Sequence, residues 1–171
     1  MVTHHPCVVR KMSNSGKDFE EDFKKSVGNQ VALTRLYDVV GGNMGVAHIC
    51  DFIVGFSPWT FYLELKSTKT NTLPLRNIST TQYEGLLDKS KYRGNIAGLL
   101  IQYRKYGEHY FVPIQEIEYL RNKGRKSVQI KDIHNKLITS YPFPATLKRT
   151  RYNYNFLEFI KLFGGSEFDT A

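Results

Sequence analysis

The chain has 171 residues, which is enough for one domain with a buried core. Its 24 Lys and Arg residues outnumber its 16 Asp and Glu residues, and the net charge of +8 favours a polyanionic partner, nucleic acid before membrane. No apolar run approaches the roughly 20 residues that span a bilayer, the first residues lack the layout of a signal peptide, and 2 cysteines are too few for a disulfide framework. We therefore expect a cytoplasmic protein with no membrane partner.

The sequence begins with a predicted tail and a predicted helix. Residues 1–15 are polar and basic, and we expect them to be flexible, followed by a single domain over residues 16–171. Ser15 is a candidate N-cap for a helix that runs to Val27. Phenylalanine and valine recur along this helix at i, i+4 and i+8, and Glu20 lies beside that apolar stripe.

Three strands are predicted next. The first covers Val31–Asp38, and the glycine-rich segment Gly41–Gly45 forms a turn after it. The second and third strands, Val46–Phe56 and Trp59–Ser67, are expected to pair as a hairpin.

The rest of the chain alternates between strands and helices. A polar loop over Thr68–Asn77 precedes a helix that opens at the capping box Ser79-Thr80-Thr81-Gln82 and ends near Lys89. The remaining predicted elements are strands at Gly94–Tyr103 and Glu108–Val112, a helix that begins at Pro113–Arg121, a short strand at Val128–Ile130 and a helix at Phe156–Phe163. This order predicts a mixed α/β fold.

The charged residues of the predicted hairpin suggest a catalytic site. Asp51 is the only charge in an apolar run, and Glu64 follows it thirteen positions later in the triplet Glu64-Leu65-Lys66. On a strand, Glu64 and Lys66 point to the same face, and pairing of the two strands can bring Asp51 beside Glu64. Two carboxylates suit a hard cation such as Mg²⁺, and a nearby ammonium can help to hold a phosphate, so the pattern fits metal-assisted phosphodiester cleavage.

A structural explanation of the same residues has to be weighed against the catalytic one. A Glu-x-Lys triplet occurs by chance about once in a chain of ordinary composition and usually marks a solvated strand face. The isolated Asp51 favours the catalytic interpretation, because an unpaired carboxylate in apolar surroundings is costly unless a partner or a metal retains it.

Several segments together resemble the RecU-type Holliday-junction resolvases of the PD-(D/E)xK nuclease superfamily. The similar stretch runs from about Gly16 to at least Ile133 and includes the late basic turn Gly124-Arg125-Lys126-Ser127-Val128. The segments that carry the resemblance are Gly16-Lys17-Asp18-Phe19-Glu20, Asp51, Glu64-Leu65-Lys66, Leu73-Pro74-Leu75-Arg76-Asn77-Ile78 and Gln82.

The resemblance implies a restriction-endonuclease-like fold, a mixed central β-sheet flanked by α-helices, over the single nuclease domain of residues 16–171. It also implies a homodimer that cuts branched DNA with Mg²⁺, or with Mn²⁺ as a substitute. By the same match, Asp51, Glu64 and the backbone carbonyl of Leu65 are metal ligands, and Lys66 is the catalytic lysine.

Two further residues are assigned roles through the resemblance. Glu20 corresponds to the acid of the family's first helix, which supports the metal directly or through water. Gln82 corresponds to a glutamine at the start of the next helix, which orients Lys66 or the attacking water.

One segment departs from the family pattern. The resolvases carry a long insertion before the catalytic Asp, which projects as a stalk into the centre of the open junction. Here only Val39–Cys50 separates Asp38 from Asp51. The departure leaves the nuclease interpretation intact and puts strict four-way-junction specificity in doubt.

Basic residues near the motifs are candidates for DNA contacts. Phosphate contacts of this kind provide affinity without reading sequence, although any single exposed cation is more often only solvated. Arg76 is the strongest candidate because it lies in one of the resembling segments. The full candidate set is Lys17, Lys69, Arg76, Arg125 and Lys126.

The C-terminal part leaves two structural questions open. Tyr152 and Tyr154, beside the basic cluster Lys148–Arg151, can stack on exposed bases or pack in the core. The stripe of Phe156, Ile160 and Phe163 can contribute to a dimer or pack on its own domain.

The remaining polar residues receive structural interpretations. Arg35 and Asp38 can form an ion pair, with a structural or a functional role. Cys50 is expected in the core. His48, His109 and His134 have no zinc-like spacing and are interpreted as structural.

Three functions are compatible with these sequence features. The leading one is a metal-dependent endonuclease of branched DNA that acts in recombination or repair. The second is a restriction- or repair-type nuclease on duplex or flap DNA, and the third is an inactive DNA-binding module of the same fold. The intact set of Asp51, Glu64 and Lys66 argues against the third.

Overall fold

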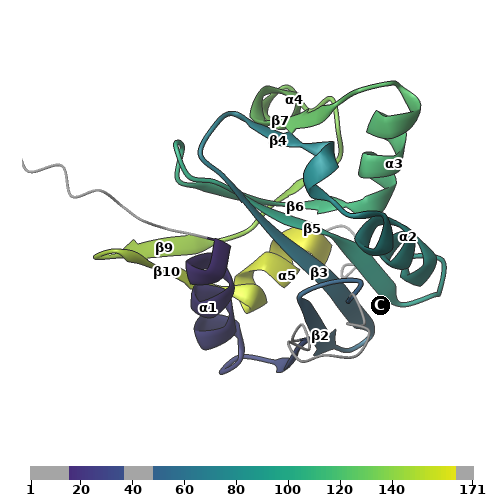
Figure 1. The fold of residues 1–171 in the computed structure, drawn as a ribbon. Helices are drawn as coiled ribbons and strands as arrows, with labels where there is room; N and C mark the ends of the chain where they lie inside the picture. Colours follow the sequence, from purple (N-terminus) through teal and green to yellow (C-terminus); the bar gives the residue numbers. More distant parts are fainter. Residues whose placement is uncertain (1–15, 37–47, 165–171) are drawn as a thin grey trace, which may run out of the picture.

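A six-stranded mixed sheet forms the centre of the molecule, whose computed structural model describes residues 16–36 and 48–164 (Figure 1). The strand order is β1-β2-β3-β5-β6-β8; β3 and β5 run parallel, and the other neighbouring pairs are antiparallel. The strands are β1 (Ala32–Arg35), β2 (Phe52–Phe56), β3 (Trp59–Thr68), β5 (Asn95–Tyr103), β6 (Glu108–Pro113) and β8 (Tyr141–Pro142).

Helices cover both faces of this sheet. Helices α1 (Gly16–Val27) and α5 (Phe156–Gly164) share one core with the side chains of Phe61 and Leu63 of β3. Helices α2 (Thr80–Lys89) and α3 (Ile114–Asn122) share the other core with alternate residues of β5. Because β3 and β5 are covered on both faces, β5 is almost continuously buried and no residue of β3 is exposed. The predicted fold class, a restriction-endonuclease-like mixed sheet flanked by helices, is confirmed.

The parallel pair β3–β5 requires a crossover connection, and this connection carries a small second sheet. The chain leaves β3 through β4 (Thr72–Pro74) and a 3₁₀ helix (Leu75–Asn77) before it enters α2. Strand β4 pairs with β7 (Ser127–Gln129), so that Pro74 lies opposite Ser127. Two basic segments about fifty residues apart therefore become neighbours.

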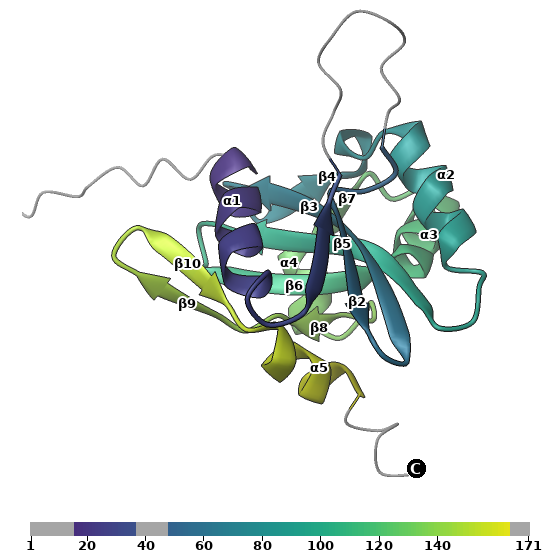
Figure 2. The same cartoon turned by 90° about the horizontal axis from the view of Figure 1, so that it is seen from below.

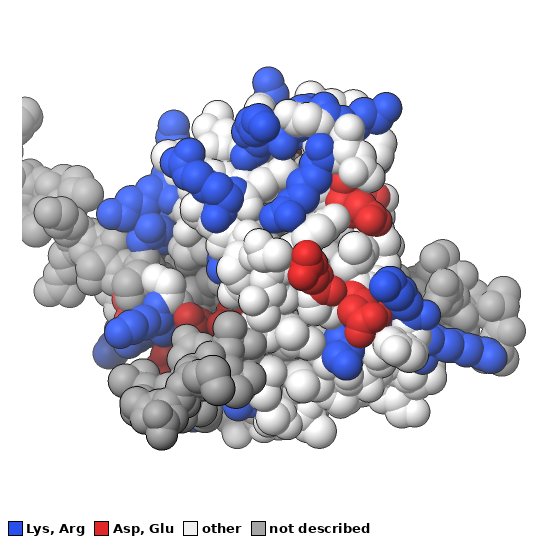
Figure 3. Space-filling view, turned by 45° about the vertical axis from the view of Figure 1, so that its right-hand side comes forward, with Lys and Arg blue, Asp and Glu red and all other residues white. Residues whose placement is uncertain are grey.

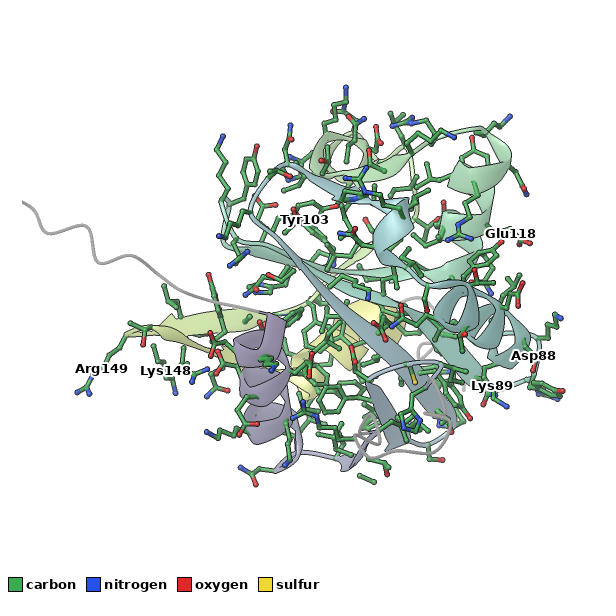
Figure 4. The ribbon with its side chains drawn as sticks, in the orientation of Figure 1. Asp88, Lys89, Tyr103, Glu118, Lys148 and Arg149 are labelled. Atoms are coloured by element: carbon green, nitrogen blue, oxygen red, sulfur yellow. The ribbon has the colours of Figure 1, made fainter. Side chains whose placement is uncertain are left out.

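The C-terminal segment forms a hairpin of β9 (Ala145–Lys148) and β10 (Arg151–Tyr154) that packs on α1. The buried carboxylate of Asp22 accepts hydrogen bonds from the backbone N–H of Tyr152 at 3.0 Å and from Arg151 at 3.1 Å. Figures 1 and 2 both place this hairpin on the side of the molecule away from α2 and α3. In Figure 4, Lys148 and Arg149 lie at its projecting tip.

The packing of the hairpin and of α5 answers the two open questions about the C-terminal part. Tyr154 is fully buried and Tyr152 nearly so, and both rings contact His109, so base stacking by these tyrosines is excluded. On α5, Phe156 and Ile160 are also buried in the chain's own core, and Phe163 packs against it. The stripe is therefore used within the domain and is not a free dimer surface.

Several predicted element boundaries are wrong. Strand β2 begins at Phe52 instead of Val46, and the predicted loop Thr68–Asn77 contains the end of β3, all of β4 and a 3₁₀ helix. The short strand is Ser127–Gln129, and α4 (Ile130–His134), β8, β9 and β10 were not predicted. Elements of two to five residues are too short to show a hydrophobic period, and only pairing with a distant partner defines them.

Some predictions fall on residues 1–15, 37–47 and 165–171, outside the described part of the chain. These are the flexible tail, the turn Gly41–Gly45, most of the Val39–Cys50 segment and the ion pair of Arg35 with Asp38. Within the described ranges, no helix is long and apolar enough to cross a membrane.

Candidate active site

The register of the β2–β3 hairpin brings the predicted acids together. Phe52 lies opposite Leu63, and the N–H of Asp51 donates to the carbonyl of Leu63 at 3.1 Å, so Asp51 sits at the level of Glu64. The carboxylate of Asp51 turns back onto β3 and accepts the N–H of Leu65 at 2.7 Å. Asp51 itself precedes the strand, which frees its side chain from the alternation of β2.

Glu64, Lys66 and Gln82 form one hydrogen-bonded group. The ammonium of Lys66 lies 2.7 Å from Glu64 Oε1, and the amide of Gln82 donates to the same oxygen at 2.6 Å. Lys66 also donates to Gln82 Oε1 at 3.3 Å. The capping box of α2, in which Gln82 and Ser79 bond each other reciprocally, fixes the glutamine at the helix start.

Glu20 and Arg35 complete the surroundings of the acids. A small cavity of about 130 Å³ is lined by Glu20 from α1, Asp51, Glu64 and Gln82, together with Arg35, Leu36, His48 and Cys50. Arg35 Nη2 bonds Glu20 Oε2 at 2.5 Å. The sequence leaves the role of Arg35 open and does not pair it with Glu20, because nothing in the pattern of β1 indicates that α1 lies beside it.

Burial makes the charge of both carboxylates costly. Desolvation raises the pKa of Asp51 to about 6, and the neighbouring Glu20 adds to this while Leu65 N–H and Lys66 oppose it. Desolvation, followed by repulsion from Asp51, raises the pKa of Glu64 as well, although the Lys66 ammonium opposes this rise. Two acids with raised pKa values in one cavity are typical of a functional site.

The donor set fits a hard divalent cation. Glu64 is only 2% exposed, and its Oε2 is buried with no hydrogen-bond partner among the described residues. An orphaned anionic oxygen of this kind is costly unless a cation or a donor binds it. In the described part of the chain, no three His, Cys, Asp or Glu side chains form a metal cluster on their own. The predicted ligand set is smaller, since it uses two carboxylates and the carbonyl of Leu65.

The structure brings three of the five predicted DNA-binding residues together. Arg76, Arg125 and Lys126 line a common hollow of about 600 Å³, while Lys17 and Lys69 are exposed elsewhere and do not line it. Arg121, which is not among the residues predicted from the sequence, also lines the hollow. Arg121 lies in the last turn of α3, and only the turn at Gly124 places it beside Arg125, so the helical pattern alone does not indicate it. Figure 3 shows Lys and Arg side chains gathered over the end of the molecule that carries β4, β7 and α3.

The chain is similar to known proteins in its sequence and in its structure. A family model described as "RecU: Recombination protein U" matches residues 24–153, a range that includes Asp51, Glu64, Lys66 and Gln82 and begins after Glu20. No curated protein sequence matches the chain significantly. A solved structure of Hjc, a Holliday junction resolvase from Archaeoglobus fulgidus, is similar to it with 20% identity and a TM-score of 0.45, over 58% of this chain and 78% of that one. Since the family model covers well over half of the sequence, the chain belongs to the RecU family and is an endonuclease of the Holliday-junction resolvase type that acts in recombination.

Proposed function

We propose that this chain cleaves phosphodiester bonds in branched DNA with Mg²⁺, or with Mn²⁺ as a substitute, at the cavity of Glu20, Asp51 and Glu64. The observation that carries the proposal is the buried, unpartnered Oε2 of Glu64 beside a second carboxylate of raised pKa. An isolated structural ion pair does not explain this oxygen, because Lys66 and Gln82 both bond the other oxygen, Oε1.

The proposed metal ligands are all oxygens. Asp51 and Glu64 supply carboxylates and Leu65 its backbone carbonyl, which is the chemistry that Mg²⁺ and Mn²⁺ accept. Glu20 supports the site directly or through water. When bound, the cation lowers the pKa of a coordinated water and neutralises charge that develops on the phosphate.

Lys66 and Gln82 act on the nucleophile and the scissile phosphate. Lys66 presents an ammonium at the edge of the cavity, where it can donate to a phosphate oxygen and favour the deprotonated form of the attacking water. Gln82 acts as a positioning residue, since its amide holds both Lys66 and Glu64 from the rigid start of α2.

DNA binding and assembly of the chain into a dimer complete the proposed function. Lys17, Lys69, Arg76, Arg125 and Lys126 contact DNA phosphates, and the chain acts as a homodimer of single nuclease domains, each spanning residues 16–171. A two-fold dimer suits this reaction, because it presents identical sites to the two related strands of a junction. A cytoplasmic location is consistent with the free, buried thiol of Cys50.

Metal-dependent cleavage of matched substrates tests the proposal. The purified protein is incubated with four-way junction, flap and linear duplex DNA in Mg²⁺, Mn²⁺, Ca²⁺ or excess chelator. Cutting is expected in Mg²⁺ and Mn²⁺, whereas Ca²⁺ supports binding without efficient turnover because its larger radius and looser geometry misplace the water. Full activity in chelator would refute the metal site, and binding without any cutting would favour an inactive DNA-binding module.

A further inference from the structure

Four cations surround one hollow next to the proposed active site. We name this the basic hollow and define it by Arg76, Arg121, Arg125 and Lys126, with Ser79 and Thr80 on its wall. Its volume of about 600 Å³ is large enough for a phosphodiester group and its sugars. The sequence suggested three of these cations as separate DNA contacts; the structure makes them, with Arg121, a single site.

The small β4–β7 sheet builds the basic hollow. The N–H of Leu75 donates to the carbonyl of Lys126 at 2.9 Å, which holds the 3₁₀ helix of Arg76 against the turn that precedes β7. Gly124 has a φ of +68°, a conformation that glycine adopts without strain, and it turns the chain back from the end of α3. Arg121 before this glycine and Arg125 after it therefore face the same space.

Two of the guanidinium groups are oriented by the protein itself. Arg121 lies over the ring of Tyr83 of α2, 3.9 Å from its centroid. Arg125 Nη2 bonds the buried carboxylate of Asp132, which does not line the hollow, at 2.5 Å. A guanidinium carries five N–H donors, so each group keeps donors for a ligand after these contacts. Pre-orientation of this kind reduces the entropy cost of binding an anion.

The charge of the basic hollow favours an anionic occupant. In the described part of the chain, no Asp or Glu lines it, and Asp132 neutralises one cation of the four. Four like charges around one space repel each other, and a bound phosphate offsets this repulsion. The bidentate geometry of arginine matches a phosphate better than it matches a small halide.

The start of α2 joins the basic hollow to the proposed active site. Ser79 and Thr80 line the hollow, and Gln82 lines the cavity of Glu64, so the two sites lie within one turn of the same helix. Each DNA strand carries one phosphate about every 3.4 Å of helix axis, so several phosphates fall close to a site of this size. A strand that crosses the start of α2 can therefore place the scissile phosphate at the cavity and another phosphate, a few nucleotides away, at the basic hollow.

We propose that the basic hollow binds a backbone phosphate of the cleaved DNA strand, within a few nucleotides of the scissile phosphate, with Arg121 as a principal contact. This inference rests on the proposed function for its substrate. It adds a second phosphate site that fixes where along the strand the cut falls.

The proposal is tested by measuring how a variant of Arg121 binds DNA, first unmodified and then with single backbone phosphates replaced by uncharged groups. Arg121→Met removes one charge and keeps an unbranched chain over Tyr83, and Lys91→Met, at the far end of α2 beside Asp88, is the matched control. Binding to a branched substrate is measured in Ca²⁺ over a range of salt concentrations. We expect Arg121→Met to weaken binding roughly tenfold and to reduce the salt slope by about one, as loss of one phosphate contact requires, while Lys91→Met matches the wild type.

A scan with single methylphosphonate groups locates the phosphate. At one position near the cut, the methylphosphonate is expected to lower the affinity of the wild type about as much as Arg121→Met does. The same methylphosphonate should lower the affinity of the variant by almost nothing further. Independent effects at every position would overturn the proposal. Binding of inorganic phosphate is measured as well. If phosphate binding depends on Arg121 but no methylphosphonate position changes DNA affinity in an Arg121-dependent way, the hollow is a site for free phosphate, and the DNA assignment is overturned.

The outcomes separate this proposal from the proposed function. Comparing the wild type with Arg121→Met on the modified substrates measures binding alone and needs no cleavage. A protein that never cuts would therefore refute the nuclease function, and the binding comparison could still be interpreted. Conversely, a flat scan with normal cleavage would refute the basic hollow alone. Circular dichroism and thermal unfolding of Arg121→Met confirm that the fold is retained.

Discussion

Glu64 is the residue on which the proposed chemistry depends most directly. Its buried Oε2 has no protein partner among the described residues, and Asp51 stands beside it at the head of β2. We expect Asp51→Asn and Glu64→Gln each to lower cleavage at least about 100-fold, because a neutral amide cannot hold the cation that activates water. DNA binding should change little, since the phosphate-binding cations lie elsewhere. Single-turnover cleavage and binding in Ca²⁺ measure both effects.

The exposed Asp88 provides the control for these two variants. It pairs with Lys91 at the end of α2, and Asp88→Asn makes the same chemical change outside the cavity. Normal cleavage by either cavity variant would show that the site is assigned wrongly.

A substitution of Lys66 distinguishes metal binding from catalysis. Its ammonium contacts Glu64 and Gln82 and supplies no metal ligand. Lys66→Ala should therefore retain Mn²⁺ binding, measured by calorimetry, and lose at least about 10-fold in cleavage rate through its missing contact to the scissile phosphate. Loss of Mn²⁺ binding in this variant would mean that the lysine only shapes the cavity.

His109 makes the stability of the fold depend on pH. Burial lowers its pKa to about 4, and its ring packs against Tyr152 and Tyr154. The unfolded histidine has a pKa of about 6.5, so the unfolded state binds the proton more readily and stability falls as the pH drops from about 6.5 towards 4. At about pH 5 the expected loss relative to pH 7 is about 2 kcal/mol.

Urea unfolding at the two pH values measures this loss. His109→Gln keeps a polar side chain near Gln102 and removes the titrating group. The difference between wild type and variant isolates His109, because Asp51 and Glu64 contribute to both. An equal pH slope in the two proteins would contradict the assignment.

Among the elements, α2 must pack closely on the segment that carries Asp51. A methyl group added at Gly85 would lie 2.6 Å from Cβ of Ile49, two residues before Asp51. We expect Gly85→Ala to displace this segment, to lower cleavage at least about 10-fold and to destabilise the fold by about 1 kcal/mol after the gain in helix propensity is included. Cleavage assays and urea unfolding check this. Gly16→Ala, where an added Cβ meets nothing within 4 Å, should behave as the wild type.

The elements also show how far the sequence predicts the structure. The period of two along β3 correctly places Phe61 and Leu63 in one core and leaves Glu64 to the other face, because strand alternation is a local property. The capping box likewise predicts the start of α2 and the position of Gln82.

The remaining parts of the site depend on distant contacts that no local pattern encodes. Arg35 meets Glu20 because α1 lies beside β1, and Arg76 meets Lys126 because three residues of β4 pair with three of β7. Tyr152 and Tyr154 were ambiguous for the same reason, since the short hairpin of β9 and β10 exists through its packing on α1.

At the scale of the whole molecule, the basic and acidic features are unevenly distributed. Lys and Arg side chains gather over the end of the molecule that carries β4, β7 and α3 (Figure 3). The start of α2 lines both the basic hollow at this end and the cavity of the proposed active site. The β9–β10 hairpin lies on the other side, and Arg151 there is engaged by Asp18 and Asp22. The DNA path is therefore expected over the start of α2 and the basic hollow, and not along the C-terminal hairpin.

Substrate choice follows from this path and from the short segment before Asp51. A dimer with two sites can nick two related strands symmetrically, which favours branched DNA over linear duplex. Only Val39–Cys50 lies between Asp38 and Asp51, too little chain for a long stalk in the junction centre. We expect clear preference for branched DNA, with affinities for four-way junctions, three-way junctions and flaps within about tenfold of one another, since phosphate contacts dominate binding. Competition binding and single-turnover cleavage at fixed salt, with sedimentation velocity to establish the dimer, measure this. Equal binding and cutting of linear duplex would instead identify a general endonuclease.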